Sequence, residues 1–246
     1  MESTYLKYQA VIFTDVNDIA PSTDNLTYFL DQFRHIELFP DNFQEIDATG
    51  ATFNRFGMRD SAGIWNVEFS SNRIDISKIS TNVNIIKIGN KIDFLNEVKG
   101  IITSTLDKFP KKAYRLAFVT TRIFWELTPK EHSKVFSNLF IPFGTPDTFE
   151  NRVEWGFRNV SRINKKIKEL TESHNVITEI NRLNGNLNID SSVKDIERLE
   201  IRADINTFHR NSEYRFGRED MIDFFRQTIE WEQEIAKEVD DHIFKD

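Results

Sequence analysis

The sequence predicts an α+β fold, with a mainly antiparallel sheet and helices packed on one face. Several short segments alternate apolar and polar residues, which is typical of half-buried strands. Longer segments place apolar residues at helical spacing, and these are separated by turn-forming residues. In the first half the two patterns follow the order β-α-β-β-β-α-β. The expected domains are residues 1–127 and 128–246, with one continuous domain as the alternative.

Residues 52–77 carry the clearest strand pattern. If Asp60–Gly63 is a four-residue turn, Met58 faces Trp65 and Arg55 faces Glu68. One side of this hairpin is then apolar, and the other is polar with opposite charges across the strands. The apolar positions change from odd to even numbers after Ser70-Ser71, which predicts a β-bulge there.

The rest of the first half is predicted to alternate strands with two helices. The first helix follows capping candidates at residues 21–24 and ends near Phe39-Pro40. The second follows Gly89-Asn90 and is ended by Pro110. The remaining strands are expected at residues 5–16, 43–49, 83–88 and 114–127, the last of them central.

The second half begins with a strong local signal for a helix. Thr128 is the expected N-cap, Pro129 the first helical residue and Glu131 the reciprocal capping residue. Residues 142–147 are rich in turn formers and form the expected boundary. Strands are expected around residues 153–157, 176–180 and 199–205. Residues 161–172 fit either a helix or a long hairpin that turns at residues 172–175.

A long helix is predicted from Arg218 to Phe244. Its apolar stripe is wide, so it is expected to pack on the sheet, and Glu230, Glu232 and Glu234 are expected in solvent. With this helix, the order of elements in each half is similar to that of ferredoxin-like α+β folds.

Composition limits the classes of function. The chain has 246 residues, a formal net charge of −7 and no cysteine, which excludes disulfides and thiolate chemistry. Its start has no signal-peptide pattern, and no apolar run is long enough to span a membrane. A composition rich in Ile, Asn, Lys and Phe is typical of AT-rich bacterial genomes. We therefore expect a cytoplasmic bacterial protein with no membrane contact.

Catalytic and cofactor motifs are absent. The sequence has no phosphate-binding glycine loop, no GxSxG elbow and no local pair of metal-ligating histidines, so no catalytic residue, cofactor or metal is expected. Asp60, Glu68 and Asp75 would be the ligands of a metal-dependent nuclease, but a Glu68–Arg55 pair on the surface is the better interpretation. The loop 207–217 mixes charged and aromatic residues, and it is either a binding loop or a polar connection. Its candidate binding residues are His209, Arg210, Tyr214 and Arg215.

A basic stretch at residues 152–168 suggests contact with a phosphate backbone. Its candidate residues are Arg152, Arg158, Arg162, Lys165, Lys166 and Lys168. Trp155 and Phe157 alternate with these charges, which favours a core role for the aromatic rings. Nucleic-acid binding would gain support if the stretch shared a face with Arg55 and Arg59.

The sequence thus favours a non-catalytic binding or assembly protein that uses a sheet face or edge to bind a protein partner. The alternative is a nucleic-acid-binding protein or metal-dependent nuclease that uses residues 152–168. A third hypothesis is a small-molecule sensor with a pocket between helices and sheet.

Overall fold

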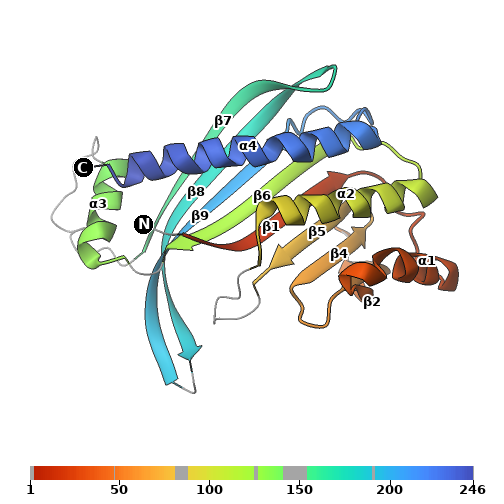
Figure 1. Ribbon diagram of the computed structural model, residues 1–246, viewed down its shortest axis with the longest axis horizontal. Coiled ribbons are helices and arrows are strands. Elements are labelled where there is room, and N and C mark those ends of the chain that lie inside the picture. Colours follow the sequence, from red (N-terminus) through yellow and green to blue (C-terminus); the bar gives the residue numbers. More distant parts are fainter. Residues whose placement is uncertain are drawn as a thin grey trace.

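The computed structural model describes residues 3–46, 48–80, 88–124, 127–140, 154–189 and 192–245. It contains a nine-stranded antiparallel sheet and four α-helices, which confirms the predicted α+β class (Figure 1). The helices are α1 (Thr23–Phe33), α2 (Lys91–Lys108), α3 (Pro129–Phe140) and α4 (Arg218–Ile243), and a short 3-10 helix, η1 (Arg34–Ile36), follows α1. The strands are β1 (Thr4–Phe13), β2 (Phe39–Ile46), β3 (Thr52–Arg59), β4 (Trp65–Ser70), β5 (Arg73–Ile79), β6 (Arg115–Phe124), β7 (Trp155–Ile167), β8 (Leu170–Ile189) and β9 (Ser192–Thr207).

One sheet runs through both predicted halves. Its order is β2-β3-β4-β5-β1-β6-β9-β8-β7, so β6 from the first half pairs with β9 from the second. Two separate ferredoxin-like halves are therefore not confirmed. The predicted boundary at residues 142–147 lies outside the described residues.

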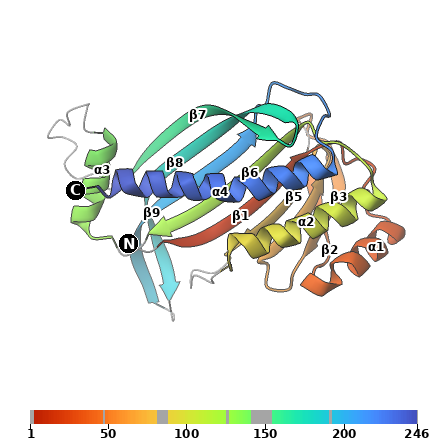
Figure 2. The same ribbon diagram turned by 45° about the horizontal axis from the view of Figure 1, so that its top comes forward.

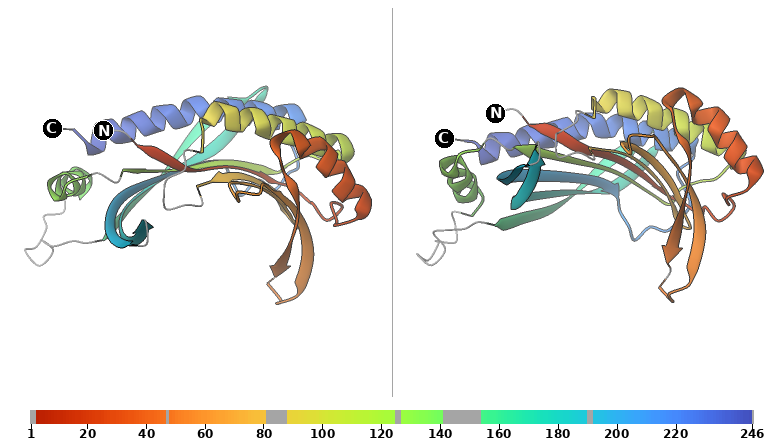
Figure 3. Two further views of the ribbon diagram at one scale, coloured as in Figure 1. Left: turned by 60° about the horizontal axis from the view of Figure 1, so that its bottom comes forward. Right: turned by 90° about the horizontal axis from the view of Figure 1, so that it is seen from below.

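The helices α1, α2 and α4 lie on one face of the sheet (Figure 2). Strands at both ends of the sheet curve away from these helices, so the opposite face is concave (Figure 3). In the described parts of the chain this concave face has no helix packed on it. The sheet therefore offers two different surfaces, one beside the helices and one open.

Large aromatic side chains join the helices to the sheet. Phe29 of α1 packs against Phe56 and Phe69, with ring centroids 5.3 and 4.9 Å away. Phe94 of α2 stacks on Trp65 at 5.4 Å. These rings bury much apolar area per residue, which accounts for the high phenylalanine content of the chain.

The predicted register of the β3–β4 hairpin is wrong by two residues. Met58 faces Val67, not Trp65, because the connection is a longer loop whose N–H groups at Ile64 and Trp65 are bound by the Asp60 carboxylate, at 2.7 and 3.0 Å. A shift of two residues leaves each side chain on its predicted face. It does remove the Arg55–Glu68 pair.

Two other predicted turns are misplaced. β4 and β5 are joined by a tight hairpin at Ser71-Asn72, where a β-bulge was predicted, and Ser70 pairs with Arg73. Residues 161–167 are strand, so the hairpin interpretation is confirmed. The turn itself is at Lys168-Glu169 instead of residues 172–175, with Lys168 in the left-handed region at φ 48°.

Candidate binding surfaces

The residues of the predicted basic stretch do not share one face. Phe157 and Ile163 of β7 point toward the helices, so by strand alternation Arg158 and Arg162 project from the concave face. Lys165 points the other way, with its Nζ 5.6 Å from the centre of the Trp231 ring on α4.

The described C-terminal end of the stretch, Lys166 and Lys168, adds nothing to a shared basic patch. Arg152 lies outside the described residues, and Lys166 is exposed near the β7–β8 turn. Lys168 is tied to the start of α4, because its backbone N–H donates to Asp223 at 2.9 Å and its Nζ lies 3.5 Å from Glu219.

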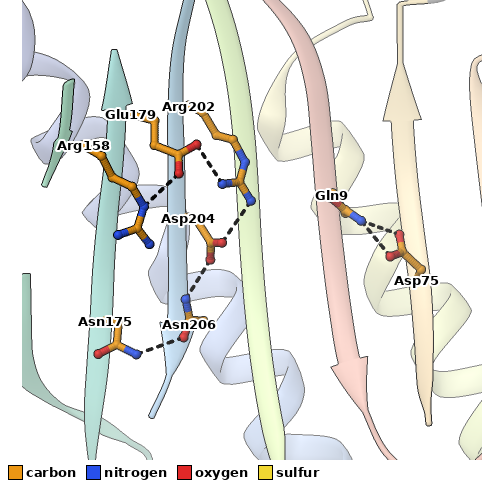
Figure 4. A network of polar contacts seen from close by, with 8 residues as sticks. All are labelled: Gln9, Asp75, Arg158, Asn175, Glu179, Arg202, Asp204 and Asn206. Carbon is orange, nitrogen blue, oxygen red and sulfur yellow. Dashed lines mark hydrogen bonds and ion pairs between the residues drawn. The ribbon is translucent and has the colours of Figure 1, made fainter. Parts of the chain in front are cut away.

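Two arginines on the concave face, Arg158 and Arg202, are paired with acids, whereas Arg162 donates to the Asn175 side chain at 3.3 Å and lies over the Phe208 ring. Arg158 donates to Glu179 at 3.1 Å, and Arg202 donates to both Glu179 and Asp204 at 3.1 Å (Figure 4). The chain of contacts continues from Asp204 to Asn206 and on to Asn175. This polar network is largely self-satisfied, so it presents little free positive charge to a phosphate.

A second polar pair lies further across the same face. The amide of Gln9 donates to both carboxylate oxygens of Asp75, at 2.8 and 2.7 Å. Burial raises the pKa of Asp75 above its ordinary value, although the Gln9 hydrogen bonds and nearby Arg73 oppose that shift. Burial also lowers the pKa of the neighbouring Lys7.

The two hairpin arginines lie at the far end of the sheet, each against an acid of β2. Arg55 donates to Glu45 at 2.7 Å, and Arg59 lies 3.6 Å from Asp41. Among the described side chains, Arg55 and Arg59 project by strand alternation from the same concave face as Arg158 and Arg162, but six strands separate β3 from β7. Within that same set, no group of three or more His, Asp or Glu residues is arranged to bind a metal ion.

The loop 207–217 is anchored mainly through Arg215. Its guanidinium donates to both oxygens of Glu172 at 2.6 and 2.8 Å and to the carbonyl of Tyr114 at 2.6 Å. Tyr214 packs edge-on against Tyr114 at 5.4 Å, whereas His209 and Arg210 are exposed. Of the four predicted binding residues, Arg215 is therefore an anchor, whereas His209, Arg210 and Tyr214 are exposed to solvent.

A cavity lies between α4 and the strands β7 and β8, and we call it the β7–α4 groove. Its volume is about 590 Å³. The floor is formed by two strands, one wall by α4, and one end by α3. The lining residues are Leu139, Phe157, Asn159, Ser161, Ile163, Lys165, Val176, Thr178, Ile180, Trp231, Glu234, Ile235, Glu238, Val239 and His242.

The groove lies where α4 crosses the sheet at an angle to the strands. Near its start α4 is tied to the β7–β8 turn through Asp223 and Lys168. Near its end it lies over β6, where Arg122 donates to Asp240 at 2.6 and 2.8 Å. Between these two contacts β7 bows away from α4 (Figure 2).

The sequence did not indicate which residues line the groove, and the prediction that Glu232 of α4 lies in solvent is wrong. Glu234 is exposed as expected, but Glu232 is buried, with 1% of its surface exposed. It accepts hydrogen bonds from Tyr5 and Thr120 and forms an ion pair with Lys91. The break that Glu232 makes in the apolar stripe of α4 was the available signal for this buried pair.

Comparison with known proteins gives little guidance. No family model and no curated protein matches the chain. One solved structure, the di-domain ARO/CYC StfQ from the steffimycin biosynthetic pathway, aligns over 95% of this chain and 96% of that chain at 7% identity, with a TM-score of 0.18. That TM-score is too low to indicate a shared fold. A search of the described helices finds none long and apolar enough to cross a membrane.

Proposed function

We propose that this chain is a non-catalytic binding protein of a bacterial cytosolic system, and that it binds a protein partner in the β7–α4 groove. The observation that supports this most is the position of the groove. It lies over the last two strands of the sheet, beside an edge strand, β7, that has no neighbour on its outer side among the described strands.

The lining of the groove fits a protein partner better than an apolar small molecule. Eight of the lining residues are apolar and seven are polar or charged, which resembles the mixed surface of a reversible protein interface. Pockets for small ligands are mostly apolar with few polar groups. The sensor hypothesis therefore has weaker support.

The β7 strand is exposed on both faces. Asn159 and Ser161, which line the groove, are exposed, and Val160 on the opposite face has 47% of its surface exposed. A long edge strand with free backbone groups is a recognised site for pairing with another chain. The strand thus adds backbone hydrogen bonds to the contacts available in the groove.

Nucleic-acid binding remains the alternative proposal, with less support. Arg158 is paired with Glu179, and Lys165 and Lys168 point toward α4. A phosphate backbone would have to displace these partners. The nuclease form of this alternative has no matching acidic cluster in the described residues, since Asp60 caps a turn and Asp75 is bound by Gln9.

A groove-filling substitution tests the proposal. Ser161→Trp puts a large side chain into the groove from an exposed strand position, so we expect it to release a partner that copurifies with the tagged chain while leaving the chain folded. Val160→Trp is the matched control, because it adds the same side chain to the same strand on the opposite face. Loss of the partner with both variants, or with neither, would contradict the proposal.

A further inference from the structure

The β7–α4 groove has the dimensions of a missing helix in the helix layer. Near its C-terminal end α4 lies over β6, and β9, β8 and β7 follow in the sheet. Three strand spacings amount to about 14 Å, whereas helices pack about 8–10 Å apart. The start of β7 is covered there by α3, whose Phe140 packs on Trp155 and Phe157 at 5.9 Å. No described helix lies over residues 159–165 of β7, so the room for one more helix beside α4 is over that part of the strand.

The length of the groove supports the same occupant. Its α4 wall runs from Trp231 to His242, which is about 17 Å at the rise of an α-helix. This corresponds to a partner segment of about three turns. The apolar contacts for such a helix are supplied by the floor, through Phe157 and Ile163, and by the α4 wall, through Ile235 and Val239.

The charge of the α4 wall indicates which charged side chains a partner helix would carry. Glu234 and Glu238 are four residues apart, so they lie one above the other along the groove. Both are exposed, and neither forms an ion pair with another described residue. Some other charged residues of α4 are paired within the helix, as Lys237 is with Asp241 and Arg226 with Asp223. The two glutamates are therefore available to cations of a partner.

We propose that the occupant is an amphipathic helix of a partner protein, with an apolar face and Lys or Arg residues four apart on the flank that meets Glu234 and Glu238. This rests on the proposed function, and it adds the shape and charge of the partner segment. The helix would complete the helix layer over β8 and β7 as α2 and α4 do over the rest of the sheet.

Two stapled helical peptides of about four turns test the proposal by fluorescence anisotropy. They share one apolar face, and one carries Lys and the other Glu at the flanking positions. The staple removes most of the entropic cost of forming the helix, so the comparison reports on charge. We expect the Lys peptide to bind at least about tenfold more tightly than the Glu peptide at low salt.

Variants of the chain test whether the preference for the Lys peptide depends on Glu234 and Glu238. Glu234→Gln/Glu238→Gln is expected to weaken the Lys peptide about five- to tenfold, because each exposed ion pair contributes a modest amount. Glu213→Gln/Glu230→Gln removes the same charge outside the groove and is expected to change nothing. Equal binding of both peptides, or no effect of the groove variant, would overturn the proposal.

The remaining outcomes separate this inference from the proposed function. If neither peptide binds but Ser161→Trp still releases the natural partner, the groove binds something other than a basic helix. If Ser161→Trp leaves the partner bound, the proposed function itself fails. Concentration-dependent dimerisation that Ser161→Trp abolishes would show that a second copy of the chain fills the groove, and this would also overturn the inference.

Discussion

Two buried ionisable side chains, Glu232 of α4 and His174 of β8, lie at the contact between this helix and the sheet. Glu232 is paired with Lys91 of α2 and accepts hydrogen bonds from Tyr5 and Thr120 of the sheet. His174 of β8 stacks on Phe224 and meets Trp231 edge-on, at 5.9 and 5.2 Å. Since Trp231 also lines the β7–α4 groove, His174 links helix packing to the binding surface.

Replacing one member of the buried Glu232–Lys91 pair is expected to lower stability much more than replacing both members. Lys91→Met leaves the Glu232 carboxylate buried without its cation, so we expect a loss of about 3–5 kcal/mol in the free energy of unfolding. The double variant Lys91→Met/Glu232→Gln keeps a hydrogen-bonding group without the charge and should recover most of that loss. Urea denaturation measures both, and a double variant no more stable than Lys91→Met would contradict the account.

His174 makes stability depend on pH. Its Nδ1 lies 3.0 Å from the carbonyl of Glu172, which only accepts, so the neutral ring carries its proton there. Burial lowers the pKa of His174 to about 4 from its ordinary 6.5. Between these values the unfolded chain binds a proton and the folded chain does not, so stability falls as the pH drops from 6.5 to 4, by about 3 kcal/mol.

His174→Phe should flatten this slope while it preserves the ring contacts with Phe224 and Trp231. Urea denaturation at several pH values between 4 and 7 measures the effect. If the variant and the original chain lose stability in parallel over that range, the slope comes from other groups.

The sequence could predict only part of this residue-scale picture. Glu232 stood out as a break in the stripe of α4, but its partner Lys91 is 141 residues away. Nothing in the local pattern indicates that the two side chains meet. The exposure of His209 and Arg210, by contrast, agrees with their place in a polar loop.

At the scale of elements, the sequence predicts features that depend on residues only a few positions apart. The start of α3 is confirmed, because the Thr128 N–H donates to the Glu131 carboxylate at 2.7 Å and the Glu131 N–H donates to the Thr128 hydroxyl at 3.3 Å. The register of the β3–β4 hairpin was not predictable, because the Asp60 carboxylate lengthens the loop through contacts that only the folded turn shows.

The cap of α3 matters for the groove, because Leu139 of this helix closes one end of it. Thr128→Ala removes a capping oxygen and is expected to destabilise α3 by about 1 kcal/mol. Faster amide hydrogen exchange in α3, with α2 unchanged, would show this. Ser133→Ala on the same helix is the control, since Ser133 donates to the Pro129 carbonyl and caps nothing. Equal acceleration in both variants would argue against a specific capping role.

At the scale of the whole molecule, the sequence predicted an antiparallel sheet covered by helices. It did not predict that one sheet runs through both halves of the chain. Alternation shows that β6 and β9 are half-buried strands, but their pairing joins residues about 80 positions apart, such as Thr120 and Ala203. The groove likewise depends on the diagonal path of α4. That path is fixed by Lys168–Asp223 at one end and Arg122–Asp240 at the other.

The central claim is that a protein partner occupies the β7–α4 groove and not the concave face. Its most direct test places a photo-crosslinking amino acid at position 161 or at position 160 and maps the adducts by mass spectrometry. Ser161 lines the groove and Val160 is its neighbour on the opposite face of β7. We expect a partner adduct from position 161 and none from position 160. An adduct from position 160 alone, or equal adducts from both, would contradict the account.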